Sequence, residues 1–355
     1  MVSHLRVVLV GVAVTLGLSA ILFSGHSLAA GQSISVTTSP VTLNLHIQPG
    51  TSNVQTLEFK NNGTVALPIV MHVEVFGAHG ATGQAAITEP APGDTSTSWL
   101  SFSPSSFIAN PNVWTTVTMT IHLPKGAALG YYYAVIFKPI LPTPSALHPV
   151  VSVKGSNAIL VLVDTGSANE KRQVRVANFS ATKHVYQYLP AVFNVTLNNN
   201  GSIFLAPTGD IFISRNSNMT NTIASIPLNH AGANVLPQSN RVFPATWADG
   251  FPVYQPKQLD GQPVTDSKGH PEQQLVWNFS KANQFRFGRY YAQLALTYND
   301  GTGSKLVISE ISFWVIPWWL LIGGFALFLL IAAGLWSIGR SIYRKFRPKS
   351  GKVKK

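Results

Sequence analysis

The feature that most constrains this chain is an uncharged apolar run near its C-terminus, from Trp318 to Ile338, followed at once by a basic segment. At about 1.5 Å of rise per residue, a helix over this run reaches roughly 31 Å, enough to cross a hydrocarbon core of about 30 Å. Aromatic residues flank both ends of the run, as they do at membrane interfaces: Trp314, Trp318, Trp319, Trp336 and Tyr343. The sequence therefore predicts one transmembrane helix over residues 317–339.

The segment that follows, residues 340–355, holds eight Lys or Arg and no acid. Positive charge beside a membrane span stays in the cytoplasm, so we expect a basic cytoplasmic tail, an extracellular body and a single-pass protein of the cell membrane. From Gly31 to Gly339 the chain is near neutral, with sixteen basic residues against thirteen acids. A nucleic-acid-binding protein carries its basic residues on a folded domain, so no nucleic-acid partner is expected.

The N-terminus carries a second apolar run, from Val7 to Phe23, preceded by Arg6 and followed by small residues at Ser27 and Ala29. This pattern is typical of a secretory signal peptide, which we expect over residues 1–30. Because the run is long for a signal, an uncleaved signal anchor is the alternative. The chain has no cysteine, which excludes disulfides, thiol catalysis and Cys-ligated zinc. An exported chain without cysteine favours a bacterium with a single membrane.

The body between these segments has the hydrophobic pattern of β-strands. Apolar and polar residues alternate from Val113 to Leu123, and shorter alternations cover residues 42–47 and 193–198. Turns rich in Gly, Pro and Asn separate these segments, and no amphipathic helix is evident between Ala30 and Pro317. The predicted fold class is all-β, with two tandem Ig-like β-sandwich domains.

An internal repeat supports the duplication. Asn61-Asn62-Gly63 and Asn199-Asn200-Gly201 each follow a predicted strand, and later each half contains a G-x-Y-Y-A sequence at the start of another strand, Gly130 to Ala134 and Gly288 to Ala292. The spacing between the two motifs is longer in the second half. A polar, Pro- and Gly-rich insert from Asp249 to Gln274, predicted to be a loop or a hairpin extension, accounts for the difference.

The predicted domains are residues 31–168 and residues 169–316, with the boundary near Gly166 to Lys171. A boundary near residue 145 is the alternative, because a proline-rich stretch there resembles a linker.

Loops at the ends of sandwiches often carry recognition. The long polar segments are Gly77 to Ser98 and the insert described above. The insert contains the possible binding residues Phe251, Tyr254 and Lys257, since an exposed aromatic beside a cation is a common interface anchor.

Candidate catalytic residues are few. Asp164-Thr165-Gly166-Ser167 resembles the aspartic-protease signature, in which two carboxylates share a proton. That chemistry needs a second such motif, which the sequence lacks, so a turn at a strand end is the preferred interpretation. The ten histidines form no metal-binding pattern, and no phosphate-binding loop opens a helix. We therefore expect no catalytic, cofactor-binding or metal-binding residues, and no enzyme.

Several short motifs resemble a known family: Ile47-Gln48-Pro49-Gly50, Leu57 to Asn62, Leu123-Pro124, Pro190 to Gly201, Asn234 to Ser239 and Phe287 to Tyr290. With the predicted signal, two sandwiches, membrane helix and basic tail, the chain resembles the WxL-interacting surface proteins of Gram-positive bacteria. That resemblance implies an Ig-like peptidoglycan-binding first domain and a second Ig-like domain that binds a host.

The predicted function is a non-enzymatic, membrane-anchored binding or adhesion protein that engages a cell-wall polymer or a secreted or surface protein. Two alternatives remain open. One is an assembly-chaperone-like module that lends an edge strand to secreted subunits. The other is an aspartic-protease-like hydrolase.

Overall fold

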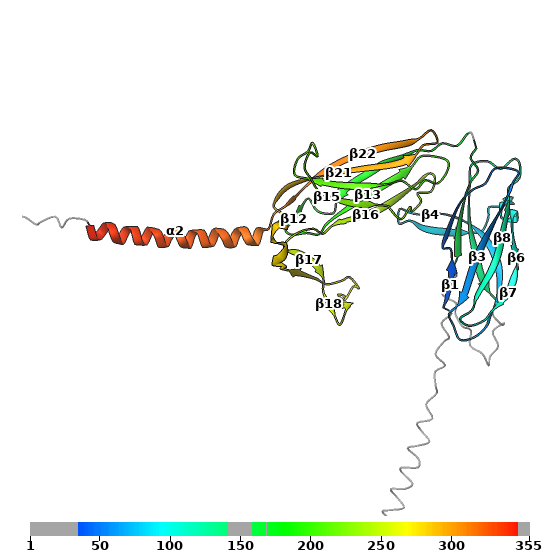
Figure 1. Ribbon diagram of the computed structural model, residues 1–355, viewed down its shortest axis with the longest axis horizontal. Coiled ribbons are helices and arrows are strands. Elements are labelled where there is room, and N and C mark those ends of the chain that lie inside the picture. The colour runs from blue at the N-terminus through cyan, green and yellow to red at the C-terminus, as the bar shows by residue number, and fades with distance from the viewer. Residues whose placement is uncertain (1–34, 141–157, 168, 347–355) are drawn as a thin grey trace, which may run out of the picture.

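The structure is a computed structural model that describes residues 35–140, 158–167 and 169–346. The predicted signal peptide and most of the proline-rich stretch lie outside the described residues. The described chain consists mostly of β-strands, with two short 3₁₀-helices and one long α-helix at its C-terminal end (Figure 1). The all-β class with a β-sandwich fold and one C-terminal apolar helix is therefore confirmed, while the division into two domains at residue 168 stays a prediction.

The first pair of sheets, called sandwich 1, is built from the strands between Val36 and Asp164. One sheet has the order β1 (Val36–Ser39), β3 (Ser52–Asn61), β8 (Trp114–His122), β6 (Leu100–Ser103). The other has the order β2 (Thr42–His46), β10 (Ala158–Asp164), β9 (Gly130–Pro139), β4 (Leu67–His79), β5 (Gln84–Thr88), with β7 (Ser106–Ala109) also paired to β4. The chain thus changes sheets between β1 and β2, and β2 pairs in parallel with β10 at one edge.

The core of sandwich 1 lies between these two sheets. The alternation predicted from Val113 to Leu123 is confirmed by β8, whose Val117, Met119 and Ile121 are fully buried. They pack with residues of the facing sheet such as Tyr133 and Ile159. Period-two alternation places every second side chain on the same face, so one face of β8 is enclosed.

The second pair of sheets, called sandwich 2, is built from the strands between Val174 and Val315. One sheet has the order β11 (Val174–Ala181), β13 (Ala191–Asn199), β16 (Ser239–Trp247). The other has the order β12 (Val185–Tyr186), β22 (Ser304–Val315), β21 (Gly288–Asn299), β14 (Thr208–Ser214), β15 (Thr222–Leu228). Its core is aromatic, with Trp247, Tyr290 and Phe313 in mutual ring contact. The strands of sandwich 1 run across the long direction of sandwich 2 (Figure 1).

Both long polar segments contain β-hairpins, which for the insert confirms the hairpin alternative. The insert of sandwich 2 is a hairpin extension, with β17 (Val253–Pro256) paired to β20 (Gln273–Val276) and β18 (Gln258–Leu259) paired to β19 (Gln262–Pro263). The first part of Gly77 to Ser98 is not a free loop, because β4 and β5 form a hairpin there. Its turn reaches sandwich 2, where the Val242 amide donates to the Ala81 carbonyl.

The repeated Asn-Asn-Gly sequence has the same structural role in both sandwiches. The buried Asn61 side chain donates to the Val65 and Ala109 carbonyls and accepts the Gly63 amide. Asn199, also fully buried, donates to the Ile203 and Val235 carbonyls and accepts the Gly201 amide. Each asparagine thus joins the end of its strand to a second segment distant in sequence.

The two G-x-Y-Y-A segments are equivalent in structure, but the structural alignment is shifted by one residue from the sequence alignment. The Tyr131 hydroxyl accepts the amide three residues before it, and so does the Tyr290 hydroxyl, both at 3.2 Å. Two residues before each tyrosine the backbone has a positive φ, +69° at Leu129 and +110° at Gly288. Gly288 therefore corresponds to Leu129, and the sequence alignment with Gly130 is wrong by one position.

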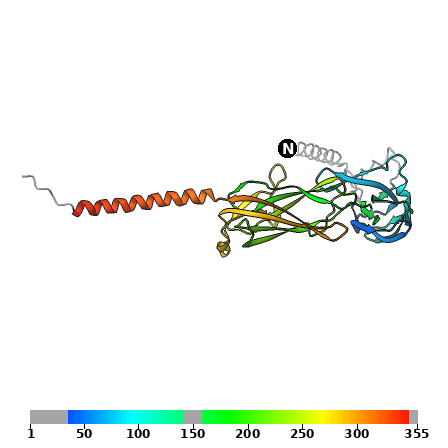
Figure 2. The same cartoon turned by 90° about the horizontal axis from the view of Figure 1, so that it is seen from above.

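The C-terminal helix α2 (Trp318–Phe346) leaves the end of sandwich 2 two residues after β22 and extends away from both sandwiches (Figure 2). Its first turn begins at Pro317, whose carbonyl accepts the Leu321 amide. By length and composition, residues 318–343 could cross a membrane. The helix continues past residue 339 into the predicted tail, because no helix breaker intervenes before Pro348.

Candidate functional site

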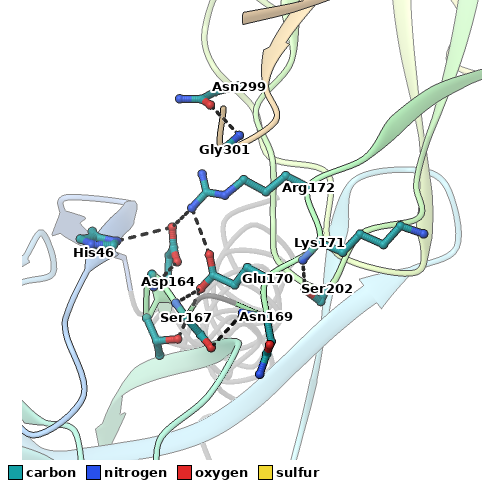
Figure 3. Close-up of polar contacts among 12 residues, drawn as sticks. His46, Asp164, Ser167, Asn169, Glu170, Lys171, Arg172, Ser202, Asn299 and Gly301 are labelled. Carbon is teal, nitrogen blue, oxygen red and sulfur yellow. Dashed lines mark hydrogen bonds and ion pairs between the residues drawn. The ribbon is translucent and has the colours of Figure 1, made fainter. Parts of the chain in front are cut away.

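Two features lie where the sandwiches meet, and the first is a charged turn after β10 (Figure 3). Asp164 ends β10, and its Oδ1 accepts the Gly166 amide at 2.8 Å. Gly166 has φ +65°, and a Cβ at this position would collide with the His46 ring. Only glycine combines this φ with this close approach, so the local sequence fixes the turn.

An arginine connects the carboxylates of this turn. Arg172 Nη2 donates to Asp164 Oδ2 at 2.8 Å and to Glu170 Oε2 at 3.1 Å. His46 Nδ1, from the end of β2, lies 3.6 Å from Asp164 Oδ2. Both carboxylate side chains are largely buried, at 13% and 4% exposure. The cluster links the end of sandwich 1 to the segment that enters β11, so it stiffens the connection between the sandwiches.

Burial and pairing shift the pKa values of Asp164 and Glu170 in opposite directions. Burial acts to raise the pKa of Asp164, but hydrogen bonds with Glu170 and the Gly166 amide, with the charge of Arg172, leave it below its ordinary value. Burial and the neighbouring Asp164 raise the pKa of Glu170. Asp164 is thus the ionised partner of Arg172, and Glu170 is the group that takes up a proton first.

This geometry gives a structural account of the protease-like motif. Asp164 lies at a strand end, as the turn interpretation expects, and its oxygens are occupied by Arg172 and by a backbone amide. An aspartic-protease pair instead presents two carboxylates to a shared water. Nothing in the arrangement of the described residues supports the hydrolase alternative.

The second feature is a cleft of about 390 Å³ between the sandwiches, within the range usual for ligand sites. Its walls come from β2, β10, β4 and β5 of sandwich 1 and from residues 231–241 of sandwich 2. The floor is apolar and includes Phe76, Leu160 and Leu162. Beside it, Phe204 and Leu236 of sandwich 2 pack against the same outer face of sandwich 1.

The polar groups of the cleft are incompletely paired. Asn234 Nδ2 donates to Asn44 Oδ1 at 2.8 Å, but the buried Asn234 Oδ1 has no hydrogen-bond partner among the described residues. Arg241 Nη1 donates to the Asn234 carbonyl at 2.6 Å. No ion pair in the described part of the chain involves Arg241, and burial lowers its pKa. The cleft therefore offers a partly buried cation and an unused acceptor.

One wall of the cleft is also a sheet edge. Within the described residues β2 pairs only with β10, so its other side is an edge. The Val41 carbonyl and the Ile47 amide bond to the β10 side, and strand alternation therefore turns the amide of Asn44 toward the open side. An unpaired edge is a template for another extended chain.

The predicted binding residues lie elsewhere, on the extension of sandwich 2. The Phe251 ring packs on Trp277 and Phe279, and the Tyr254 ring packs on Tyr188. Lys257 is exposed and lies 3.4 Å from Glu272. Phe251 and Tyr254 thus belong to one aromatic cluster, joined through Trp277 and Tyr188, and Lys257 follows the end of β17. A role of these residues in binding stays a prediction.

The sequence did not identify Arg241 or Asn234 as site residues. Asn234 lies in a segment that carried the family resemblance, which was the available signal. No sequence signal pointed to Arg241, because only the folded structure shows that no described acid pairs with it. In the described part of the chain, no group of three His, Asp or Glu side chains is placed to hold a metal ion.

Comparison with known proteins gives a fold likeness only. No protein-family model matches the chain, and no curated protein matches it significantly. Among solved structures it is similar to the class 5 fimbriae chaperone CfaA, with 13% identity over 78% of this chain and 99% of that one, at a TM-score of 0.35. It is also similar to the E. coli chaperone DraB, with 12% identity, coverage of 79% and 98%, and a TM-score of 0.33.

Proposed function

We propose that this protein is a membrane-anchored, non-enzymatic binding protein that holds an extended segment of a secreted or cell-surface protein in the cleft between its sandwiches. The observation that carries the proposal is the cleft itself. Its apolar floor lies beside Arg241, which forms no ion pair among the described residues, and beside the edge of β2 that no described strand covers. These three elements match the backbone, the apolar side chains and an acidic group of an extended peptide.

Each element has a separate role in binding. The partner's backbone pairs with the outward amides and carbonyls of β2, which supplies affinity without dependence on sequence. Alternate side chains of the partner pack on Leu160 and Leu162. An acidic group on the partner pairs with Arg241, and an amide donates to Asn234 Oδ1. Satisfying a buried polar group of this kind contributes about 1–3 kcal/mol.

The anchor is the apolar helix α2. Residues 318–343 cross the membrane, the basic residues beyond them stay in the cytoplasm, and both sandwiches lie outside. A cell-wall polymer remains a further proposed partner through the resemblance to WxL-interacting proteins. The open strand edge favours a protein, because a polysaccharide has no backbone that could extend the sheet.

A second candidate is the chaperone-like form of the same function, which the open edge of β2 favours. In that form the partner is a secreted subunit that leaves when its own assembly completes, whereas an adhesion partner stays bound. Pulse-labelling of the captured protein separates the two, because a chaperoned subunit is released over time.

Photo-crosslinking from the cleft tests the proposal in intact cells. A benzophenone amino acid at Thr42, which is exposed in the cleft, is expected to capture a secreted or surface protein, and the same group at the exposed Val54 on the far sheet is not. Arg241→Gln is expected to reduce the capture. Arg175→Gln is the matched control, since Arg175 is exposed on β11 and its side chain bonds to Asn198 and to no other described residue. Identical products from both positions, or capture unaffected by Arg241→Gln, would contradict the proposal.

A further inference from the structure

The end of sandwich 2 from which α2 leaves carries an unusual number of exposed aromatic side chains. Phe279 is 72% exposed, and Trp277, Phe285, Phe287 and Trp314 are each between 41% and 45% exposed. Large apolar side chains scattered singly on a surface need no explanation, but a gathered set marks an interaction site. We call these five residues, with Phe251, the aromatic end face.

The aromatic end face is assembled from distant segments. Phe251 precedes β17, whereas Trp277 and Phe279 follow β20, yet the Phe251 ring centroid lies 5.7 Å from that of Trp277 and 5.4 Å from that of Phe279. The Phe251 amide donates to the Gln284 carbonyl, which brings the segment of Phe285 alongside. The aromatic residues are therefore held in place by the fold, not by a flexible loop.

The aromatic end face is continuous with the start of α2. Only Ile316 and Pro317 separate β22 from Trp318, and the Ile316 amide donates to the Tyr186 carbonyl on β12. Two residues further along, the Tyr188 ring lies 6.4 Å from that of Trp277. Both ribbon views place the extension at the end of sandwich 2 where the helix begins (Figures 1 and 2).

The charges around the aromatic end face are mainly positive. Arg286 pairs with Asp249 at 2.9 Å. Lys281, on the short helix η2 (Phe279–Gln284), and Arg289, at the start of β21, form no ion pair among the described residues. Arg289 instead packs over the Tyr291 ring and donates to Ser312. Two cations thus remain available beside the rings.

We propose that the aromatic end face lies in the outer interface of the same membrane that α2 crosses, with Lys281 and Arg289 toward anionic lipid headgroups. This inference rests on the proposed membrane anchoring by α2. Aromatic rings favour the headgroup level of a bilayer, where an apolar face and a polar rim are both accommodated. The short connection to α2 holds the end face at the membrane at high effective concentration, so shallow insertion requires little intrinsic affinity.

Shallow insertion has a consequence for binding. A sandwich attached only through Ile316 and Pro317 could rotate about the helix, whereas a second contact with the membrane fixes its direction. The cleft between the sandwiches would then face a defined way above the cell surface, and the exposed Phe279 would leave water without a protein partner.

Because the chain contains no cysteine, single-cysteine labelling tests this directly. The full chain is reconstituted in vesicles of phosphatidylcholine and phosphatidylglycerol, with or without lipid carrying a doxyl group near the headgroup. Three variants, Phe279→Cys, Phe325→Cys on α2 and Ile108→Cys on sandwich 1, are each labelled with a nitrobenzoxadiazole dye. All three side chains are between 63% and 72% exposed, so the changes leave the core intact.

We expect the doxyl lipid to reduce fluorescence at positions 279 and 325 and not at position 108. Quenching at 325 without quenching at 279 would overturn the inference while leaving the membrane anchor intact. No quenching at either position would show that membrane anchoring by α2, and with it that part of the proposed function, is wrong. A label at 279 that is shielded from both doxyl lipid and aqueous iodide would indicate a protein contact in place of lipid, and would also overturn the inference.

Discussion

The two sandwiches share a local framework but differ in what surrounds it. In each, a buried asparagine at a strand end makes three hydrogen bonds, two of them to carbonyls of other segments, and a tyrosine at the start of a central strand caps the preceding turn. Sandwich 1 uses the outer face of its second sheet to meet sandwich 2, whereas sandwich 2 carries the hairpin extension and the aromatic end face. The two sandwiches therefore share these bonds between side chains and backbone, and they differ in their surfaces.

The largest effect is expected where the two sandwiches connect. Arg172→Ala leaves the buried Asp164 and Glu170 without their cation and is expected to lower the free energy of unfolding by about 4 kcal/mol at neutral pH. Denaturant titration of the full chain in detergent measures this. Arg175→Ala, an exposed arginine on β11, is the control, and an equal loss in both variants would show that the cluster adds no stability of its own.

The carboxyl groups of Asp164 and Glu170 make the free energy of unfolding depend on pH in a defined direction. The raised pKa of Glu170 contributes stability at pH values below its unfolded pKa, and this is lost as the pH rises through the folded pKa. The lowered pKa of Asp164 contributes stability above its unfolded pKa, and this is lost as the pH falls through the folded pKa. Glu170→Gln is expected to remove the loss on the alkaline side and to retain the acid loss. Unfolding curves from pH 3 to 8 that superimpose for the variant and the wild type would contradict this assignment.

Substituting Asn61 and Asn199 tests whether the two equivalent asparagines contribute equally to the free energy of unfolding. Asn61→Ala and Asn199→Ala each leave two carbonyls and one amide without their partner, so each is expected to cost about 3 kcal/mol. Thermal unfolding of the two variants provides the comparison, with Asn53→Ala on β3 as control, since the half-buried Asn53 side chain bonds to the neighbouring Gln55 side chain and to no carbonyl among the described residues. A large loss for only one of the two would show that the sandwiches do not depend on the motif equally.

The turn before each tyrosine needs a residue with positive φ, which is Leu129 in sandwich 1 and Gly288 in sandwich 2. Gly288→Ala places a side chain at φ +110° and is expected to cost about 1 kcal/mol, although no atom would collide with the new Cβ. Leu129→Gly relieves the positive φ but adds freedom to the unfolded chain, so its net effect is expected to stay within about 0.5 kcal/mol of zero. Equal effects at the two positions would contradict their structural equivalence.

The smallest effect is expected at the tip of the extension, which sandwich 1 lacks. Removing residues 258–271 and joining Lys257 to Glu272 with Asn-Gly retains β17 and β20, because the Lys257 amide already donates to the Glu272 carbonyl. The free energy of unfolding is expected to change by less than about 0.5 kcal/mol. A longer deletion that began at Pro252 would also remove Val253, which is buried in the core of sandwich 2. A large loss from the short deletion would show that the tip supports the sandwich.

The sequence by itself determined the elements whose physics is local. Alternation over Val113 to Leu123 specified β8, and the length and apolarity of the run from Trp318 specified α2, because each pattern follows from the period of one element. The repeated asparagine motif was also visible, since Asn-Asn-Gly forms its turn through adjacent residues.

Tertiary structure alone decided how distant segments meet. Tyr131 corresponds to Tyr290 because both hydroxyls accept the amide three residues before them. The two sequence motifs alone do not show this, because both also match when Tyr132 is aligned with Tyr290. Arg241 became a site residue because it lines the cleft and forms no ion pair with a described acid. The aromatic end face became a surface because Phe251 and Trp277 converge from opposite ends of the extension. Pairing, burial and exposure are properties of neighbours in space, and short sequence motifs do not encode them.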